Sequence, residues 1–397
     1  MRSMLLFSTD EYRERLARAQ VAMREAKLDA MLVSAPNNLV YISGYRTNLF
    51  DSNFRPFLSL VTASGDPVLI LPTLEVGVGE EVSWIEDIRS WGAAPGSVAW
   101  KGMKPVIAAD SLNAARIVIE ERKLTNARIG IEQGFGQRIG MSMEQFGQLK
   151  SMLPKVEWTD STALFWKLRS VKSKTEIEYL RRASKITDAG YQTVLENARE
   201  GMTERDLQGI MGQTYMREGS DYRGFIIVQA GPERYKMMNP YATDRKVQRG
   251  DGVTFDFGAV YNGYWSDLTR TFYVGSVSPK QRELYEVSRE VSAMTVEAVR
   301  PGITCEEVDA VAEQELIKRG YKEHMLHRTG HSIGLEVHEL PSIGLGEKTV
   351  MQPGMTFAIE PGIYDFSVGG FRVEDIVLVT ENGREYLSNC QRDLTIV

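Results

Sequence analysis

Hydrophobic and polar residues along this chain follow a helical period first. Apolar side chains recur every three or four positions near the N-terminus, at Tyr12, Leu16, Ala19 and Met23. This spacing places them on one face and predicts an amphipathic helix with Thr9 as its N-cap. A short apolar run at residues 31–33 predicts a buried strand, and Pro36-Asn37-Asn38 predicts a turn after it.

The pattern then continues with strands and helices in turn. Two apolar runs flank Gly65-Asp66 in residues 57–71, which predicts a hairpin, and ARIGIE at 127–132 predicts a buried strand. We therefore expect an α/β domain over residues 1–165. The charged, helix-like phrase LRSVKSKTEIEYLRRA follows, so we expect a linker near 166–173 and a second domain over residues 166–397.

The second domain contains an internal repeat. GMTERDL at residue 201 and GITCEEV at residue 302 are 101 residues apart, and MREG and IKRG end with the same separation. Each copy has a threonine, Thr203 or Thr304, that suits a helix N-cap, with acidic residues in the following turn. Two copies of one helix–helix–strand unit predict a pseudo-symmetric domain with a site between its halves.

Composition narrows the choice of partners. The 397 residues are 43% hydrophobic and 25% charged, with a net charge of −6, as in ordinary globular proteins. We expect no nucleic-acid partner, because an acidic chain without a basic run is poorly suited to phosphate backbones. We expect no membrane partner, because no apolar run approaches the length of a bilayer span. Two cysteines make no disulfide framework, so we expect a cytoplasmic protein.

Four carboxylates lie in strand-like, glycine-flanked segments. Each shares its strand face with small or polar residues, opposite aromatic or aliphatic ones: Asp256, Asp267, Glu360 and Glu374. Any one of them fits the solvent face of a half-exposed strand. Together with histidines they favour a metal site, because buried carboxylates must be paired, neutralised or metal-bound. Several carboxylates with an imidazole suit manganese, cobalt, iron or zinc.

All four histidines fall within residues 324–338. HELP is not a zincin motif, because no second histidine follows at the required spacing. Gly330 and Gly334 oppose a continuous helix. We expect a loop and a strand here that bring His331 and His338 to one cavity.

The ordered carboxylates and histidine resemble those of the pita-bread metallohydrolases, which include prolidase, Xaa-Pro aminopeptidase, methionine aminopeptidase and creatinase. The phrases that carry the resemblance are DFGAVYNGYWSDLTRTF, GHSIGLEVHELP, TFAIEPGIY, FRVEDIVLV and SVKSKTEIEYLRRA. The resemblance implies a creatinase/prolidase-like α/β N-terminal domain and an α+β pita-bread catalytic domain with an internal pseudo-twofold repeat.

The resemblance also implies the ligands of two divalent metal ions. They are Asp256, Asp267, His331, Glu360 and Glu374. In this family Asp267 and Glu374 would bridge both ions, which would hold a nucleophilic hydroxide. Manganese is the family's habitual metal, with cobalt, zinc or iron as alternatives. All five ligands are present here, whereas creatinase has lost most of them. The complete set favours a metal enzyme.

Further roles follow from the same resemblance. Glu360 would pass the water proton to the leaving amine, and His338 would hydrogen-bond the oxyanion. His327 matches a substrate-contacting histidine, and Arg372 would orient a carboxylate or the substrate. His324 matches no functional position and is expected to be structural.

One position departs from the family. Six residues before the arginine of the TDR phrase, a histidine is expected, and this chain has Asn239. Asparagine donates a hydrogen bond but carries no charge. Nearby Tyr241 is a candidate for shaping a different pocket. By analogy with creatinase-like homodimers, Arg46 or Arg55 would reach the partner's site and contact an anion.

The function expected from the resemblance is cleavage of a C–N bond, in an Xaa-Pro dipeptidase or Xaa-Pro aminopeptidase that is a homodimer. Two alternatives remain open. One is a hydrolase or lyase of a small osmolyte, guanidino compound or amide on the same fold, which Asn239 motivates. The other is a non-catalytic binding protein, against which the complete ligand set argues.

Overall fold

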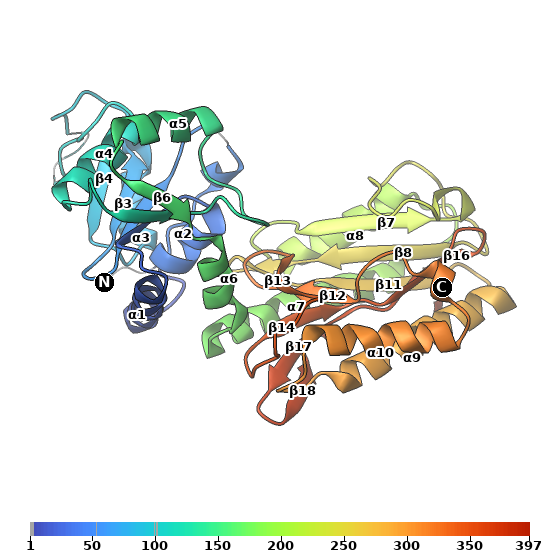
Figure 1. Ribbon diagram of the computed structural model, residues 1–397. Coiled ribbons are helices and arrows are strands. Elements are labelled where there is room, and N and C mark those ends of the chain that lie inside the picture. Colours follow the sequence, from blue (N-terminus) through green and yellow to red (C-terminus); the bar gives the residue numbers. More distant parts are fainter. Residues whose placement is uncertain (1–3, 53, 99, 101) are drawn as a thin grey trace. The chain divides into compact units, whose positions relative to one another are not determined.

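The computed structural model describes residues 4–52, 54–98, 100 and 102–397. It divides into two units, Met1–Arg169 and Ser170–Val397 (Figure 1). The division falls inside the segment 166–173 that was predicted as a linker. Helix α6 (Thr162–Ser170) extends through the first part of that segment, because Phe165, Trp166 and Leu168 are buried.

The N-terminal unit contains one six-stranded sheet in the order β4-β3-β2-β1-β5-β6. The central strands β1 and β5 are parallel, and β1, β2 and β3 form antiparallel pairs. The strands are β1 (Ala30–Val33), β2 (Leu58–Thr62), β3 (Val68–Pro72), β4 (Asp87–Trp91), β5 (Arg128–Ile131) and β6 (Glu157–Asp160). The other helices are α1 (Thr9–Glu25), α2 (Pro36–Ser43), α3 (Val76–Val82), α4 (Ser111–Glu121), α5 (Met143–Met152) and the 3-10 turns η1 (Asn48–Asp51) and η2 (Thr73–Glu75).

The first predicted elements compare closely with this unit. Helix α1 buries Tyr12, Leu16, Ala19 and Met23 as predicted, although Ser8 rather than Thr9 is the N-cap. The hairpin β2–β3 and the strand β5 are confirmed. The turn predicted at Pro36 is wrong, because Pro36 occupies the first turn of α2, where its fixed φ suits a helix. The buried carboxylate of Glu132 accepts hydrogen bonds from the backbone of Ser34 and Ala35 just before this helix.

The C-terminal unit contains two larger sheets and two helix pairs. One sheet has the order β19-β11-β8-β7 and the other β13-β12-β14-β17-β18. The first comprises β7 (Phe225–Ala230), β8 (Gly252–Gly258), β11 (Leu268–Tyr273) and β19 (Thr395–Ile396). The second comprises β12 (Gly330–Ser332), β13 (Glu339–Ile343), β14 (Thr356–Ile359), β17 (Asp375–Thr380) and β18 (Gly383–Tyr386).

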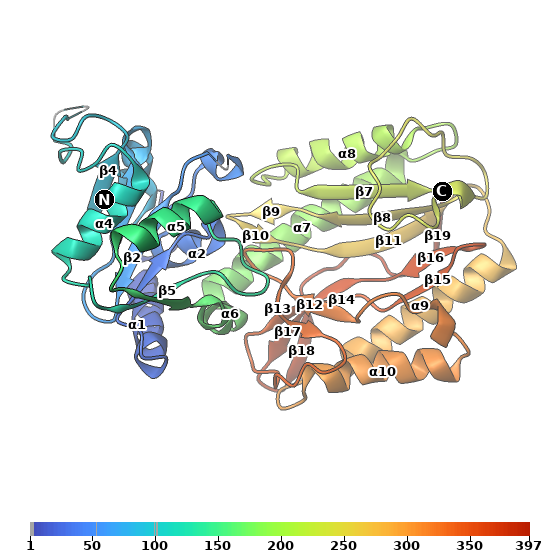
Figure 2. The ribbon, with the colours of Figure 1, turned by 45° about the horizontal axis from the view of Figure 1, so that its top comes forward.

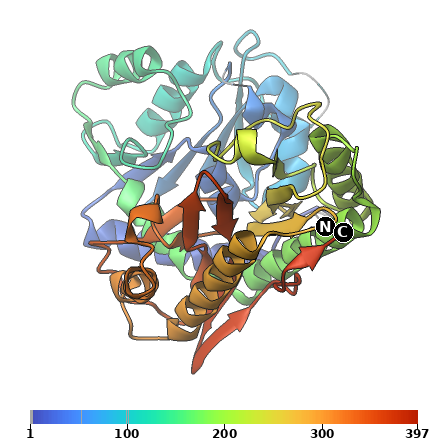
Figure 3. The same cartoon turned by 90° about the vertical axis from the view of Figure 1, so that its right-hand side faces the viewer.

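Each helix pair packs beside its own sheet. Helix α8 lies along β7, and α10 packs on β13; the green and orange pairs are separate in Figures 2 and 3. The helices are α7 (Lys174–Asn197), α8 (Glu204–Arg217), α9 (Pro279–Ala298), α10 (Cys305–Lys318), η3 (Pro232–Arg234) and η4 (Lys322–His324). Two small ribbons complete the unit: β9 (Val260–Tyr261) with β10 (Tyr264–Trp265), and β15 (Gly362–Asp365) with β16 (Gly369–Arg372).

The predicted repeat is confirmed by matching hydrogen bonds at the starts of α8 and α10. Thr203 and Thr304 each cap their helix in a capping box with an acidic residue three positions later. The backbone N–H of Gly201 donates to Val247 (2.8 Å), and that of Gly302 donates to Met351 (3.0 Å). Each half also has a hydrophobic core of its own, around Phe255 in the first half and Phe357 in the second. The unit is therefore pseudo-twofold, and a further cluster joins Tyr273 of the first half to helix α9 of the second.

No helix in the described part of the chain is both long enough and apolar enough to cross a bilayer.

Candidate metal centre

The first half of the C-terminal unit supplies two aspartates. Asp256 lies in the middle of β8, where Phe255 and Phe257 point into the hydrophobic core and leave Asp256 on the opposite face. Asp267 directly precedes β11, the strand that pairs with β8. The predicted face of Asp256 in β8 is therefore confirmed.

The second half supplies a histidine and two glutamates from three neighbouring strands. His331 lies in β12 opposite Ala358 of β14, and Glu360 directly follows β14. The backbone N–H of Glu360 donates to Thr329 O at 2.8 Å, which extends the strand pairing to this predicted ligand. Glu374 directly precedes β17. The segment 330–338 is a strand and loop, as predicted.

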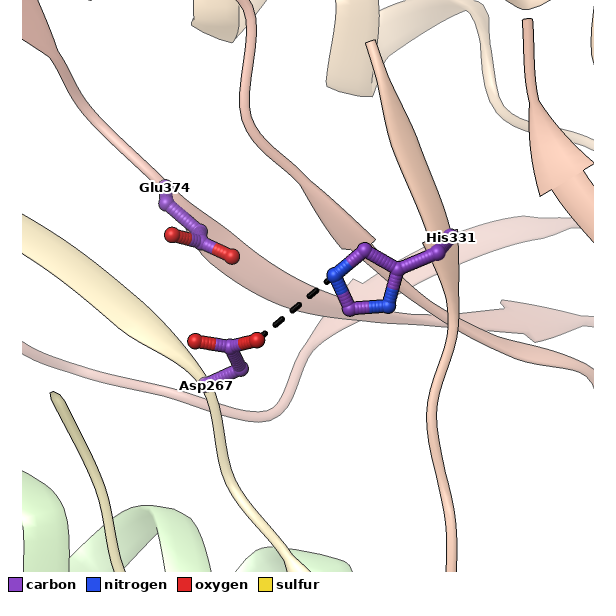
Figure 4. A group of neighbouring side chains, drawn as sticks. All are labelled: Asp267, His331 and Glu374. Carbon is purple, nitrogen blue, oxygen red and sulfur yellow. Dashed lines mark ion pairs between the residues drawn. The ribbon is translucent and has the colours of Figure 1, made fainter. Parts of the chain in front are cut away.

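These side chains converge at the seam between the two halves. Donor atoms of Asp267, His331 and Glu374 lie within 4.8 Å of one another (Figure 4). The Nε2 atom of His331 is 3.6 Å from Oδ2 of Asp267 and 3.5 Å from Oε1 of Glu360. His331 and Glu374 are almost fully buried. The cluster joins strands of the two halves, and Asp267 and Glu374 are 107 residues apart in the sequence.

Burial and mutual repulsion set the protonation of the cluster. Burial, and then the neighbouring carboxylates, raise the pKa of Asp267 and of Glu374 well above their usual range. Burial raises the pKa of Glu360 to about 7. Burial and the neighbouring His338 lower the pKa of His331 to about 3, so its imidazole is neutral. Facing carboxylates beside a neutral imidazole are a donor set that suits a divalent cation, which would relieve their repulsion.

Arg372 is the cation within this cluster. Its Nη2 contacts Asp256, and its Nε lies 3.6 Å from Glu374 and 3.8 Å from Glu360. The Nε group also donates to Thr269 Oγ1 at 2.7 Å, and that hydroxyl donates to Glu374 at 2.6 Å. Arg372 and Thr269 therefore fix the orientation of the carboxylates.

A cavity of about 740 Å³ opens onto the cluster. Asn239, His327 and His338 all line it, as do the predicted ligands and Arg372. The rings of His331 and His338 are 4.2 Å apart between centroids. Removal from bulk water and the charge of Arg328 lower the pKa of His338. The structure thus brings the predicted histidines to one cavity.

The remaining two histidines interact with Tyr364. The Nε2 atom of His327 is 2.6 Å from the Tyr364 hydroxyl, and its Nδ1 is 2.7 Å from the carbonyl of Arg328. Burial lowers the pKa of His327 to about 4. The Nδ1 atom of His324 is 3.0 Å from the carbonyl of Tyr364, away from the predicted ligands.

Tyr241, a predicted substrate residue, does not line this cavity. The side chain of Tyr241 is 93% exposed and lies outside the cavity wall, since Arg234 holds its carbonyl on a surface loop (2.8 Å). Arg55 belongs to the N-terminal unit, where its guanidinium lies 5.1 Å from the Phe54 ring centroid.

The sequence prediction missed Arg328 on the cavity wall. Its Nε donates to Gly330 O at 3.0 Å, and no carboxylate in the described ranges pairs with its Nη atoms. Its position directly after His327 was the available signal. Trp265, Phe225 and Ile227 add an apolar side to the cavity.

Each of the two units matches a known protein family. Residues 178–381 match the model of metallopeptidase family M24, and residues 15–171 match that of the creatinase/prolidase N-terminal domain. The first match includes all five predicted ligands.

Similar proteins match along nearly the whole chain. An Xaa-Pro dipeptidase of Pyrococcus furiosus is 31% identical, covering 96% of this chain and 99% of that protein. An Xaa-Pro dipeptidase of Lactobacillus helveticus is 33% identical, covering 96% and 98%. The crystal structure of a prolidase from Thermococcus sibiricus aligns with a TM-score of 0.85 and 29% identity, covering 98% of this chain and all of that one.

Proposed function

This chain belongs to metallopeptidase family M24, and from that premise we propose that it is an Xaa-Pro dipeptidase dependent on two divalent metal ions. The observation that carries the proposal is the buried cluster of carboxylates and one neutral imidazole beneath a cavity of about 740 Å³. The Xaa-Pro dipeptidases that it resembles match from end to end.

We assign the ions to the predicted ligands Asp256, Asp267, His331, Glu360 and Glu374, with manganese as the metal. Bound there, they would polarise the peptide carbonyl and lower the pKa of a water molecule. The protein's part is to hold the donors, orient the substrate and move protons. We further propose that the protein is cytoplasmic and forms a homodimer. Sedimentation of the purified protein would test the dimer.

Glu360 is the proposed proton carrier. Its carboxylate has a pKa raised to about 7 before metal binding, and it lies at the edge of the cavity. A carboxylate in this place would accept the proton of the attacking water on Oε and deliver it to the leaving proline nitrogen. His338, a neutral imidazole in the same wall, would donate an N–H to the developing oxyanion.

A chain of hydrogen bonds positions His327 on the cavity wall; it runs through Arg372 and Tyr364. Arg372 donates to the Tyr364 hydroxyl (3.1 Å), which in turn donates to His327 Nε2. We assign His327 the tautomer with a proton on Nδ1, because that nitrogen faces the carbonyl of Arg328. This chain of hydrogen bonds holds His327 on the cavity wall, where the substrate would contact it.

Arg328 is the proposed anchor for the substrate's terminal carboxylate. Its guanidinium can bind a carboxylate in two parallel hydrogen bonds. In a dipeptide that carboxylate belongs to the residue after the scissile bond. One further residue would move it by roughly 3.5 Å, beyond hydrogen-bonding reach. This length dependence favours a dipeptidase over an aminopeptidase, and Trp265 and Phe225 offer apolar surface for a proline ring.

Hydrolysis by manganese-loaded protein of Xaa-Pro dipeptides and Xaa-Pro-Xaa tripeptides tests the proposal. We expect turnover of dipeptides and little turnover of tripeptides. Cleavage of tripeptides alone would make it an aminopeptidase, and no turnover of either would exclude a peptidase.

One observation favours a second candidate. Asn239 lies in the cavity wall where the family resemblance predicts a histidine, so the wall has one less titratable group. A hydrolase or lyase of a small osmolyte, guanidino compound or amide fits that change. Replacing Asn239 with histidine discriminates the two candidates. Increased turnover of Xaa-Pro dipeptides would support the second candidate, in which Asn239 adapts a peptidase site to another substrate. Decreased turnover would support an Xaa-Pro dipeptidase that uses Asn239.

A further inference from the structure

A second buried charged group lies close to the proposed metal centre. Lys172 precedes α7, and its backbone N–H donates to Gly354 O at 2.9 Å. Its Nζ donates to Glu339 Oε2 at 3.1 Å and to Ser332 Oγ at 3.2 Å. The side chains of Lys172 and Glu339 are each 1% exposed. Neither residue lines the cavity, so this ion pair has no part in the chemistry proposed above.

Both partners of Lys172 are sequence neighbours of active-site histidines. Ser332 follows His331 in β12, and Glu339 follows His338 at the start of β13. Ser332 and Glu339 pair across these two strands, after a bulge at His331. Adjacent residues of an extended chain point to opposite sides. The ammonium group therefore binds the back of the segment whose front carries the imidazoles.

The carboxylate of Glu339 also organises the loop between the strands. Its Oε1 accepts from the backbone N–H of Glu336 at 3.2 Å. A Cβ at Gly334 would lie only 2.8 Å from this oxygen, so glycine is required for the carboxylate to enter the loop. The loop carbonyl of Gly334 accepts from the N–H of Trp265 at 2.9 Å. The position of Glu339 thus sets the path of residues 333–338.

We propose that Lys172 is a positioning residue, which holds His338 against His331 by neutralising Glu339 behind the loop. Without the ammonium group, the buried carboxylate of Glu339 loses a charged hydrogen-bond donor, which is strongly unfavourable, so Glu339 would shift and the loop would repack. His338 would move with the loop, while His331 would stay in its strand pairing with β14. The effect on catalysis rests on the proposed function, in which His338 contacts the oxyanion.

Kinetics of four variants test this role: Lys172→Met, Glu339→Gln, the double variant Lys172→Met/Glu339→Met, and the exposed control Lys174→Met. We expect Lys172→Met to lower kcat for an Xaa-Pro dipeptide at least about tenfold, with KM and bound metal unchanged within about twofold. The double variant should recover part of kcat, because it removes both charges. Lys174→Met should match the unmodified protein. Glu339→Gln retains the shape and serves if Lys172→Met does not fold.

Imidazole nitrogen NMR of the metal-free protein gives a readout that needs no activity. The chain has four histidines, so the signals are few, and His338→Gln assigns one of them. We expect the His338 signal to shift in Lys172→Met and Glu339→Gln but not in Lys174→Met. An unchanged His338 signal, or an unchanged kcat per folded molecule with only a lower Tm, would overturn the positioning role. If the unmodified protein turns over no Xaa-Pro dipeptide, the proposed function fails, and the NMR result still decides the position of His338.

Discussion

Two buried carboxylates, Glu374 and Asp375, are neighbours in sequence and opposite in environment. Glu374 faces the candidate metal centre, where it shares one guanidinium, that of Arg372, with Asp256 and Glu360. Asp375 faces the other way and accepts from Arg270 (2.7 Å), Arg392 (2.7 Å) and Ser388 (2.8 Å). Both carboxylates are almost fully buried. The two equally buried carboxylates therefore differ in role. The cluster around Glu374 has an excess of negative charge that a cation would neutralise, whereas the charge of Asp375 is matched by arginines and stabilises the fold.

The largest expected effect is on catalysis, through Glu374→Gln. Losing this proposed metal ligand should lower kcat/KM for Xaa-Pro dipeptides by roughly 10³-fold or more, a magnitude typical of removing a main source of transition-state stabilisation. The metal-free protein should unfold with a free energy within about 1 kcal/mol of the original, because the change also removes repulsion. Urea unfolding in a chelator measures this, and a large loss of stability would contradict the contrast with Asp375.

The matched change Asp375→Asn should act on stability instead. It leaves the fully buried guanidinium of Arg270 without its carboxylate, which costs about 3–5 kcal/mol in comparable buried pairs. The same urea experiment measures the loss. If Asp375→Asn were as harmless as Glu374→Gln, the Asp375 pair would contribute nothing to the fold.

Two arginines differ in the same way as the two carboxylates. Arg270 pairs with Asp375, whereas Arg328 has no carboxylate partner in the described ranges. Arg328→Ala should raise KM for an Xaa-Pro dipeptide by roughly 10–100-fold, as expected for a hydrogen-bonded charge worth about 1.5–3 kcal/mol. Dipeptide amides, which lack the terminal charge, are the control substrates. Equal effects on the acid and the amide would remove the anchoring role.

The smallest expected effect is the pH dependence of metal binding. The pKa of Glu360 is raised to about 7, so below that pH an ion must displace its proton. Affinity should fall about tenfold per pH unit below 7 from this group alone and level off above it. Folded metal-free protein binds this proton more tightly than unfolded chain, so its stability should fall as pH rises from about 4.5 to about 7. Titration calorimetry at several pH values measures the affinity; a flat profile would contradict the charge excess.

Periodicity in the sequence predicted much of this fold because burial repeats with secondary structure. The faces of β8 and the capping boxes of α8 and α10 followed from residue spacing alone. The turn at Pro36 was misjudged, because Glu132, nearly 100 residues away, binds the backbone before α2. Spacing gave no sign of this long-range contact.

The predicted site was limited in the same way. The five predicted ligands meet because each lies within a paired strand or directly beside one: Asp256, Asp267, His331, Glu360 and Glu374. The exposure of Tyr241 depends on a loop contact with Arg234, and the partner of Lys172 is 167 residues away. Local sequence contains neither relation.

The seam between the halves gives the proposed ions a mechanical consequence. Two donors come from the half with α7 and α8, and three come from the half with α9 and α10. A separated half would keep its own hydrophobic core but only part of the coordination shell. Metal binding would therefore stabilise the association of the two halves, and separating the halves would release the metal.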